Sequence, residues 1–349
     1  MEDKVEIKNL TPSMLEHIIV GMGLPRYRTD QIINWIYAKG VTDWDTMTNL
    51  SKELRKQLAQ NFSHQILVPK EILLSRDGTR KFLFVLKDGL TIESVLIPDK
   101  DRRTLCISSQ VGCPLKCGFC YTGTIGFKRH LETWEILEQV LAVKRALRVD
   151  EHPTNIVFMG MGEPLLNYDN VIKAVEILNM DNGLKFSHRR ITISTAGILP
   201  AIEKLSQEQA PISLALSLNA PDDKTRSKIM PINKNYPLDE VLKALTKFPL
   251  SNRKRITFEY VMLADVNDTP LHARQLGNKI KSFPCKVNLI PFNLFPNASF
   301  SPSPADTIEE FQKTLREKHI STFIRKSRGA DILAACGQLA GKTPHLESH

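Results

Sequence analysis

Several features that would assign a class at once are missing from the sequence. Apolar stretches such as Ile18–Leu24 and Ile156–Met161 are far shorter than the roughly 18 residues that cross a bilayer. The chain has no G-x-x-x-x-G-K-[ST] loop and no H-E-x-x-H motif. It also has no internal repeat and no low-complexity tract. These absences exclude a membrane-spanning helix, a P-loop nucleotide-binding protein, a zinc hydrolase with the H-E-x-x-H motif and a solenoid.

The composition is that of a folded protein with a basic bias. Hydrophobic residues make up 42% of the 349 residues and charged residues 24%, and the formal net charge is +9. Residues 1–65 contain equal numbers of basic and acidic residues, so the whole excess lies in residues 66–349. Basic residues dominate two stretches, Lys224–Arg255 and Gln312–Arg328. Such clusters are either solvated surface or contacts to a polyanion such as nucleic acid.

The expected environment follows from the first residues and the cysteines. The chain starts with Met1, Glu2 and Asp3 and shows no apolar signal segment there, so we expect a cytoplasmic protein without membrane contact. Thiols stay reduced in that compartment. The six cysteines therefore indicate metal binding or catalysis before structural disulfides.

The pattern of apolar residues divides the chain into four parts. Residues 1–64 have helical spacing, with Thr11 and Ser51 as predicted N-caps, and form an expected helical accessory domain. Residues 65–100 alternate with period two around Asp-Gly turns, which predicts a short antiparallel β connector. Residues 101–300 form the main domain, and residues 301–349 form a C-terminal extension.

The main domain alternates strands with helices, which predicts a parallel sheet with crossover helices. The expected strands are Thr104–Ser108, Asn155–Met159, Arg190–Thr195, Ile212–Leu218, Ile256–Leu263 and Lys286–Phe292. Six strands are too few for a closed eight-stranded barrel. The fold class is therefore α/β with a partial (β/α)6 barrel.

The strongest chemical signal is a Cys-x3-Cys-x2-Cys motif. Cys113, Cys117 and Cys120 follow the first strand of the main domain, at the end where barrel active sites lie. Three thiolates on one loop can bind three irons of a cubane cluster and leave the fourth iron open. A zinc site closed by a fourth Cys or His has comparable spacing. Phe119, an aromatic residue just before the last Cys, favours the cluster.

This motif resembles that of the radical S-adenosylmethionine (SAM) superfamily, and the resemblance covers about residues 104–295. It implies a [4Fe–4S] cluster on Cys113, Cys117 and Cys120, with SAM bound at the open iron. Other strand ends carry Gly or polar residues in places that the superfamily uses for SAM. The implied SAM-binding residues are Gly162, Glu163, Ser194, Ser217, Leu218, Asn219 and Asn293.

The C-terminal sequence narrows the resemblance. Residues 328–339, which include Cys336, are similar to the terminal motif of the RlmN/Cfr group of radical SAM RNA methyltransferases. The helical N-terminal part and the segments around Glu93 and Cys106 also resemble RlmN, and this resemblance implies that the accessory domain of residues 1–64 binds RNA. Ala330 and Leu333 stand where the group has acidic residues, and Asn219 stands where it has His.

The resemblance implies a mechanism for methylating an electron-poor ring carbon. Cys336 is the expected methyl acceptor and forms S-methylcysteine, since a thiolate is a good nucleophile toward the methyl group of SAM. A radical on that methyl carbon then adds to adenine. Glu93 is the expected base that removes the ring proton, and Cys106 is the expected thiol that releases the product from Cys336. We also expect Cys106 and Cys336 to be able to form a disulfide.

The expected function is methylation of adenine C2 in 23S ribosomal RNA and some tRNAs. The alternatives are methylation of adenine C8, as in Cfr, and a zinc-bound RNA-binding protein without catalysis. A radical SAM activase of another protein is a further alternative, but it leaves Cys336 and the basic surface unexplained. The expected partners are the RNA substrates and an external electron donor such as a flavodoxin or ferredoxin system, and the expected state is a monomer.

Overall fold

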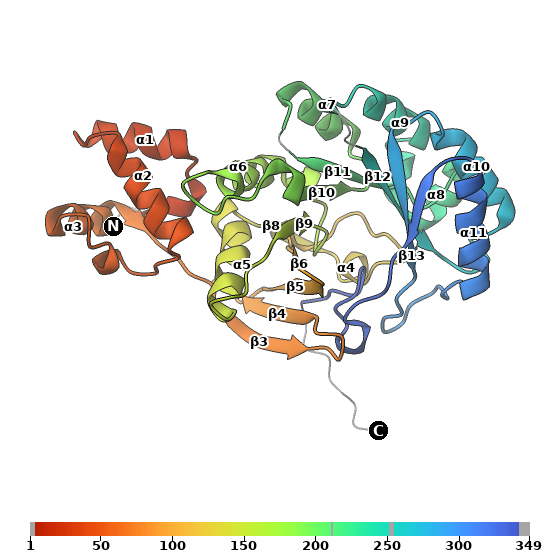
Figure 1. Cartoon of the computed structure of the whole chain (residues 1–349), viewed down its shortest axis with the longest axis horizontal. Coiled ribbons are helices and arrows are strands. Elements are labelled where there is room, and N and C mark those ends of the chain that lie inside the picture. The colour runs from red at the N-terminus through yellow and green to blue at the C-terminus, as the bar shows by residue number, and fades with distance from the viewer. Residues whose placement is uncertain (1–3, 211, 251–254, 342–349) are drawn as a thin grey trace.

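The computed structural model describes residues 4–210, 212–250 and 255–341. Its N-terminal part forms a small helical module beside the main body (Figure 1). The elements of this module are β1 (Val5–Glu6), α1 (Pro12–Gly21), α2 (Tyr27–Ile33), α3 (Lys52–Asn61) and β2 (Phe62–Ser63). Both predicted N-caps are confirmed, because Thr11 accepts a hydrogen bond from the Met14 amide and Ser51 accepts one from the Leu54 amide.

The main body is built on one sheet of ten strands. These are β3 (Pro69–Leu74), β4 (Arg80–Val85), β5 (Thr91–Asp99), β6 (Arg102–Cys106), β9 (Asn155–Phe158), β10 (Ile191–Thr195), β11 (Ser213–Ser217), β12 (Ile256–Met262), β13 (Cys285–Pro291) and β14 (Ser321–Ile324). Their order is β14-β13-β12-β11-β10-β9-β6-β5-β4-β3. The six expected parallel strands are confirmed as β6 and β9 to β13, and β14 adds a further parallel strand.

The predicted hairpin strands are present as β3, β4 and β5, and they continue the same sheet. β5 pairs antiparallel with β6, so backbone hydrogen bonds run from the hairpins into the barrel without a break. The turns between these strands contain Gly78 and Gly89, with φ of +84° and +79°. Glycine adopts this backbone conformation without the steric cost that a side chain would bring.

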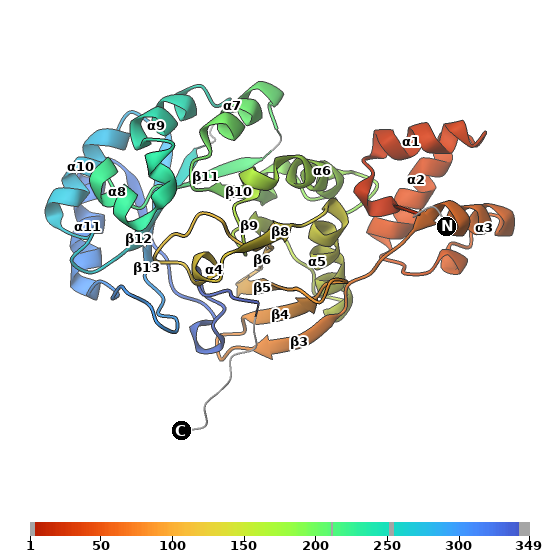
Figure 2. The same cartoon turned by 180° about the vertical axis from the view of Figure 1, so that it is seen from behind.

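Helices cover the outer face of the parallel strands, as both views of the ribbon show (Figures 1 and 2). They are α5 (Thr133–Ala146), α6 (Tyr168–Asn179), α7 (Leu199–Glu208), α8 (Asp223–Ile229), α9 (Leu238–Thr246), α10 (Pro270–Ile280) and α11 (Ala305–Glu317). A short helix, α4 (Tyr121–Thr124), and a small hairpin of β7 (Gln110–Gly112) and β8 (Phe127–His130) flank the cysteine motif. The sequence patterns did not predict these last three elements or α8.

The pairing register decides which side chains face the inside of the barrel. Cys106 pairs with Val95 on one side and Val157 on the other, and Glu259 pairs with both Ser217 and Asn288. Directly paired residues share a face of the sheet. Glu93, two residues before Val95, shares the face of Cys106 for the same reason.

A buried ionic cluster joins the N-terminal module to α5. Lys8 is fully buried, and its Nζ lies 3.0 Å from Glu138 Oε1 and 3.8 Å from Glu6 Oε1. The second carboxylate oxygen of Glu138 accepts hydrogen bonds from Leu67 N at 2.9 Å and Arg145 Nη2 at 2.6 Å. Burial lowers the pKa of Lys8, although Glu138 and Glu6 oppose this change. Because each buried charge needs its partner, the cluster fixes how the module sits on the barrel.

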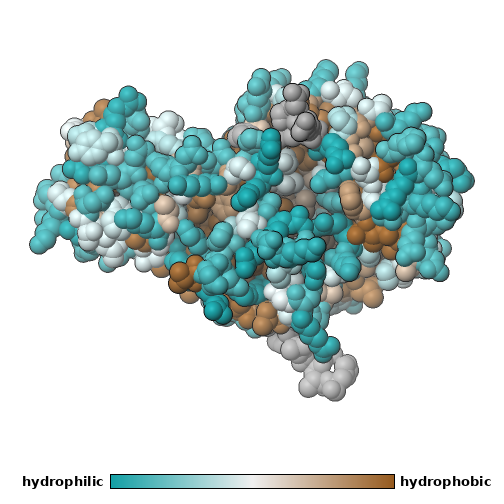
Figure 3. Space-filling view, viewed as in Figure 1, coloured by the Kyte–Doolittle hydropathy of each residue, from teal (hydrophilic) through white to brown (hydrophobic). Residues whose placement is uncertain are grey.

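The surface is mostly hydrophilic on the face shown in Figure 3, and hydrophobic side chains are visible there over β3. Ile72 and Leu74 of this edge strand are exposed. No helix within residues 4–210, 212–250 and 255–341 has the length and apolar character that crossing a membrane requires.

Candidate functional site

The cysteine motif lies on a loop between β7 and α4, at the carboxyl end of the sheet. The loop is closed at its base by a hydrogen bond from Cys113 N to Gly126 O at 3.0 Å. Gly112 has φ of +75°, and a Cβ there would lie 1.7 Å from Gly126 O. Only glycine permits this approach of the two chain segments. A second hydrogen bond, from Gly118 N to Ile229 O at 3.0 Å, ties the loop to the end of α8.

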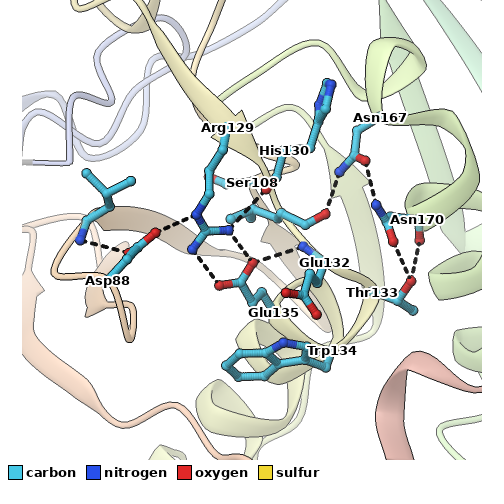
Figure 4. A network of polar contacts seen from close by, with 12 residues as sticks. Asp88, Ser108, Arg129, His130, Glu132, Thr133, Trp134, Glu135, Asn167 and Asn170 are labelled. Carbon is cyan, nitrogen blue, oxygen red and sulfur yellow. Dashed lines mark hydrogen bonds and ion pairs between the residues drawn. The ribbon is translucent and has the colours of Figure 1, made fainter. Parts of the chain in front are cut away.

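A polar network holds the hairpin that carries this loop (Figure 4). Arg129 donates two hydrogen bonds to the Glu135 carboxylate, at 2.7 and 2.8 Å, and one to Asp88 at 2.5 Å. Asn167 donates from one amide to the Ser109 and Leu131 carbonyls, at 2.8 and 2.7 Å. The bonds to Glu135 raise the pKa of Arg129, and the bond from Arg129 lowers the pKa of Asp88. The network joins β8, α5, α6 and the β4–β5 turn, so the loop has a rigid base.

The three thiols of the loop lie close enough together to influence one another. Burial raises the pKa of Cys113 to about 12, and Cys120 adds to this change. Burial also raises the pKa of Cys117, and Cys120 and Cys113 raise it further. The three thiols are half-buried on one short loop, so a positively charged group bound among them would hold them as thiolates.

The spacing of these thiols fits an iron–sulfur cluster. No three His, Cys, Asp or Glu side chains of the described residues lie close enough together to hold one metal ion, and this includes the loop cysteines. A four-iron cluster binds each thiolate through a different iron, so its ligands do not converge on a single atom. The donor set of Cys113, Cys117 and Cys120 therefore suits such a cluster.

The segment after β9 forms the second wall of the site. Gly162 has φ of +103°, and a Cβ there would lie 2.5 Å from Gln110 Cβ, so glycine is required. The Gln110 side chain accepts a hydrogen bond from Glu163 N at 2.8 Å. Glu163 is buried, and its carboxylate accepts hydrogen bonds from Leu165 N and Ala196 N. Burial raises the pKa of Glu163 to about 7 and outweighs these hydrogen bonds.

The predicted residues at the ends of β10 and β11 meet beside this segment. Ser194 and Ser217 are half-buried on the inner face of the sheet, and Leu218 is buried. Asn219 has φ of +58°, a conformation that Asn tolerates better than most residues. Its side chain is buried, with Nδ2 3.2 Å from Met230 Sδ and Oδ1 accepting from Val261 N at 2.8 Å. The side-chain amide of Asn219 is therefore already bonded to neighbouring residues of the fold.

The C-terminal segment, residues 329–341, crosses between the hairpin strands and the loop that follows β13 (Figure 1). Asn293 Nδ2 donates to the Cys336 carbonyl at 3.1 Å, and Gly337 O accepts from Tyr121 N at 2.7 Å. Gln338 Nε2 donates to Leu294 O at 2.6 Å. These bonds place Cys336 beside the end of the cysteine loop.

Cys336 and Cys106 come together although 230 positions separate them in the chain. Cys336 is exposed, but desolvation by the protein around its thiol raises the pKa of Cys336, and Glu259 and then Cys120 raise it further. Cys106 is buried; burial raises its pKa and the nearby Cys336 raises it further. Both thiols are free, so the expected disulfide is not present in this structure.

Glu93 lies on the same inner face and is almost completely buried. One carboxylate oxygen lies 2.9 Å from Lys81 Nζ. The other accepts hydrogen bonds from Ala340 N at 2.8 Å and Gly341 N at 3.0 Å. Lys81 Nζ also donates to Leu333 O at 3.2 Å. Glu93 and Lys81 therefore connect the hairpin strands to the segment that carries Cys336.

The structure adds residues that the sequence analysis missed. Lys81 and Gln110 contact the predicted residues, but nothing in their local sequence distinguishes them from ordinary strand residues. Arg226 lies in the stretch that we predicted to be a basic surface, yet it is fully buried. That expectation is wrong for Arg226, because its guanidinium finds backbone oxygens inside the fold. Arg253 and Lys254 of the same stretch lie outside the described residues.

Comparisons with known proteins agree with this geometry. The family described as the radical SAM superfamily matches residues 107–274, and the ribosomal RNA large subunit methyltransferase N-terminal domain matches residues 5–63. A dual-specificity RNA methyltransferase RlmN of Geobacter sulfurreducens is 50% identical over 99% of this chain and 95% of its own length. The RlmN of Pelobacter propionicus is 48% identical over 98% of this chain and 97% of its own.

A solved structure extends the agreement to the fold. The crystal structure of a radical SAM methyltransferase from Sphaerobacter thermophilus superposes with a TM-score of 0.90 at 41% identity, covering 97% of this chain and 100% of that one. The superfamily uses a [4Fe–4S] cluster and SAM. The alternative of a zinc-bound protein without catalysis is therefore rejected. This chain belongs to the RlmN family of radical SAM methyltransferases.

Proposed function

We propose that this protein methylates C2 of an adenine in 23S ribosomal RNA, and in some tRNAs, through a methylated cysteine. The observation that carries the proposal is that hydrogen bonds from Asn293 and Tyr121 hold the Cys336 segment beside the cysteine loop, close enough to Cys106 for the two thiols to influence each other. A ring carbon that is not nucleophilic cannot take a methyl group directly from SAM. Two thiols at one site provide an acceptor for the methyl group and a means of releasing the product. Relatives named dual-specificity RNA methyltransferases support RNA as the substrate.

The cofactors have a natural place in this site. Cys113, Cys117 and Cys120 would hold the [4Fe–4S] cluster. SAM would lie against Gly162, Glu163, Ser194, Ser217, Leu218, Asn219 and Asn293. When bound, the cluster and SAM supply a transferable methyl group and a radical that abstracts hydrogen. The Glu163 carboxylate, already oriented by two backbone amides, suits the ammonium group of SAM.

Cys336 is the proposed methyl acceptor. It is exposed, and its backbone carbonyl is held by Asn293, so the thiol can face SAM first and adenine later. Its sulfur takes the methyl group as a thiolate and leaves a thioether. Loss of a hydrogen atom from that methyl group gives the carbon that bonds to adenine C2, and the protein is then covalently attached to RNA.

Glu93 and Cys106 are proposed to resolve this attachment. Glu93 takes the proton from C2, and the bound cluster would accept the one unpaired electron that radical addition leaves on the adduct. Lys81 supplies a counter-charge for the buried carboxylate of Glu93. The Cys106 thiolate then attacks the Cys336 sulfur, so an S–S bond forms and the S–C bond to the product breaks. The electron pair of that bond stays on the methylene carbon, which takes up a proton to become the methyl group. An external dithiol must reduce the transient S–S bond before the next turnover.

We further propose that the enzyme is a cytoplasmic monomer that receives electrons from a flavodoxin or ferredoxin system. C8 methylation would use the same pair of thiols, so the product must be identified directly. Mass spectrometry of ribosomal RNA from a strain that lacks the gene, with and without complementation, distinguishes 2-methyl- from 8-methyladenosine. Restoration of 8-methyladenosine alone would refute the C2 proposal.

The roles of the two thiols predict different failures. Cys106→Ala can still be methylated and can still join adenine, so it should accumulate as a covalent protein–RNA species. Cys336→Ala has no acceptor and should form no such species. The measurement is a denaturing gel with and without ribonuclease. Cys285→Ala is the matched control, because Cys285 is a buried thiol at the start of β13, and it should behave as the parent protein does.

The iron content of each variant must equal that of the parent protein before the gels are compared. Normal turnover by Cys106→Ala would contradict the proposed roles. A ribonuclease-sensitive band with Cys336→Ala would contradict them as well.

A further inference from the structure

Arg226 of α8 is the largest fully buried side chain that the proposed chemistry does not use. Its guanidinium makes four hydrogen bonds. Nε donates to Leu218 O at 3.0 Å, and Nη2 donates to Ala196 O at 2.7 Å and to Ser217 O at 3.1 Å. Nη1 donates to Asn233 Oδ1 at 2.8 Å. One side chain therefore holds three carbonyls at the carboxyl ends of β10 and β11.

These carbonyls belong to the part of the sheet where SAM is proposed to bind. Ser217 and Leu218 are themselves proposed SAM contacts, and Ala196 follows Ser194 by two residues. Ala196 N also donates to Glu163 Oε2 at 2.8 Å. The position of Arg226 thus sets the spacing of the two strand ends and, through Ala196, the orientation of Glu163.

Among the residues that the structure describes, the acceptors of the Arg226 guanidinium are three backbone carbonyls and one amide oxygen, and no carboxylate is hydrogen-bonded to it. Burial lowers the pKa of Arg226 to about 10, and Cys117 and Asp223 act against this change. A guanidinium remains positive at neutral pH under these conditions. A buried positive charge without a bound anion is costly unless another negative group lies near it.

Asp223 of the same helix is one negative group near Arg226, and the cysteine loop supplies a second. The loop touches α8 through the Gly118 N to Ile229 O hydrogen bond, one turn beyond Arg226. Cys117 precedes Gly118 and is the thiol on which the charge of Arg226 acts. Thiolates and a reduced cluster are anionic, so a nearby cation stabilises the reduced form.

We propose that Arg226 is a positioning residue that fixes the β10 and β11 ends for SAM and places one positive charge beside Cys117. This inference rests on the assignment of the cluster and SAM residues under the proposed function. It predicts two separable effects, one on SAM affinity through the hydrogen bonds and one on the reduction potential of the cluster through the charge.

The test uses the full-length protein with its cluster reconstituted under anaerobic conditions. Arg226→Gln removes the charge, and Arg226→Lys keeps the charge but cannot reach all four acceptors. The readouts are iron and sulfide content, the midpoint potential from a titration followed by electron paramagnetic resonance, and the Kd for SAM by calorimetry. Lys228→Gln is the matched control, because it makes the same charge change at an exposed position of α8.

Arg226→Gln should shift the midpoint potential to more negative values and weaken SAM binding by about tenfold or more. Arg226→Lys should weaken SAM binding, while the midpoint potential of its cluster should equal that of the parent protein. Lys228→Gln should change neither quantity. Where Arg226→Gln does not fold, the Lys variant decides: unchanged SAM affinity, or a potential shifted to negative values, would overturn the inference.

Failure of this inference differs from failure of the proposed function. A parent protein that takes up no cluster or binds no SAM contradicts the proposed function. A parent protein that binds both, together with an Arg226→Gln variant that has the same potential and the same SAM affinity, contradicts only the role of Arg226.

Discussion

Replacing Lys8 by Met removes one partner from the buried cluster that joins the N-terminal module to α5. Lys8 has no exposed surface, and Met has a similar length, so the change leaves the Glu138 carboxylate with one charged partner fewer and creates little new space. Breaking a buried ion pair from one side costs about 3–5 kcal/mol, because the remaining charge stays out of water. An exposed pair contributes about 1 kcal/mol or less.

The expected result is a local loss of stability where the module meets the barrel. Amide hydrogen exchange in residues 5–67 should become roughly 100- to 1,000-fold faster, which corresponds to the lower part of that energy range. Exchange in β11 and β12 should change little. Hydrogen exchange followed by mass spectrometry measures both regions in one experiment.

Two further variants make the reasoning testable. Lys8→Met combined with Glu138→Gln removes both charges and keeps an amide acceptor near Leu67 N, so it should lose less than the two single changes together. Lys204→Met is the control, because the Lys204–Asp169 pair, at 3.2 Å, is exposed. If Lys8→Met changed exchange no more than Lys204→Met does, the cluster would not be what fixes the module.

Three other predictions follow from the site. Cys117→Ala should abolish cluster binding and turnover, since two thiolates remain for three irons; full iron content in this variant, measured by chemical analysis, would contradict the cluster. Asp77 binds the Gly329 amide at 3.0 Å; burial raises its pKa, but hydrogen bonds from Thr79 and Gly329 lower it to about 2. The stability that the Asp77 carboxylate contributes is therefore present above pH 3.8 and lost as the pH falls towards 2. The free energy of unfolding of Asp77→Asn, measured in urea, should be about 1 kcal/mol lower than that of the parent protein at pH 6, and this difference should disappear in acid. Leu333 has φ of +50°, so Leu333→Asn should stabilise the protein by about 0.5–1 kcal/mol in urea unfolding.

Leu333 is also one of the positions at which the sequence departs from the pattern that we expected for the family. The family resemblance led us to expect an acidic residue at position 333, and the structure places Leu333 in the left-handed region. Short polar side chains tolerate that region by hydrogen bonding to the local backbone, and Leu cannot. The neighbouring Asp331 still anchors the segment, through the Ser75 hydroxyl at 2.6 Å and the Arg76 amide.

Local chemistry was sufficient for much of the fold. The period of the apolar residues, the caps at Thr11 and Ser51 and the Asp-Gly turns predicted helices and strands that the structure contains, because each signal acts within a few residues. The Cys113–Cys120 motif indicated either a cluster or a zinc site for the same reason, since all three thiols lie on one short loop, and the resemblance to the radical SAM superfamily favoured the cluster. The local sequence also indicated that Gly162 and Ser217 lie at the ends of strands.

Tertiary structure decided everything that depends on distant parts of the chain. Cys106 and Cys336 meet only because residues 329–341 cross to the hairpin strands, and no local pattern encodes that crossing. Lys81 and Arg226 look like ordinary solvated cations in the sequence. Burial of Lys81 beside Glu93, and of Arg226 beneath three strand-end carbonyls, depends on which elements pack together. Side-chain burial is a property of the assembled fold, so only the structure could show that these two charges are buried beside the proposed site residues.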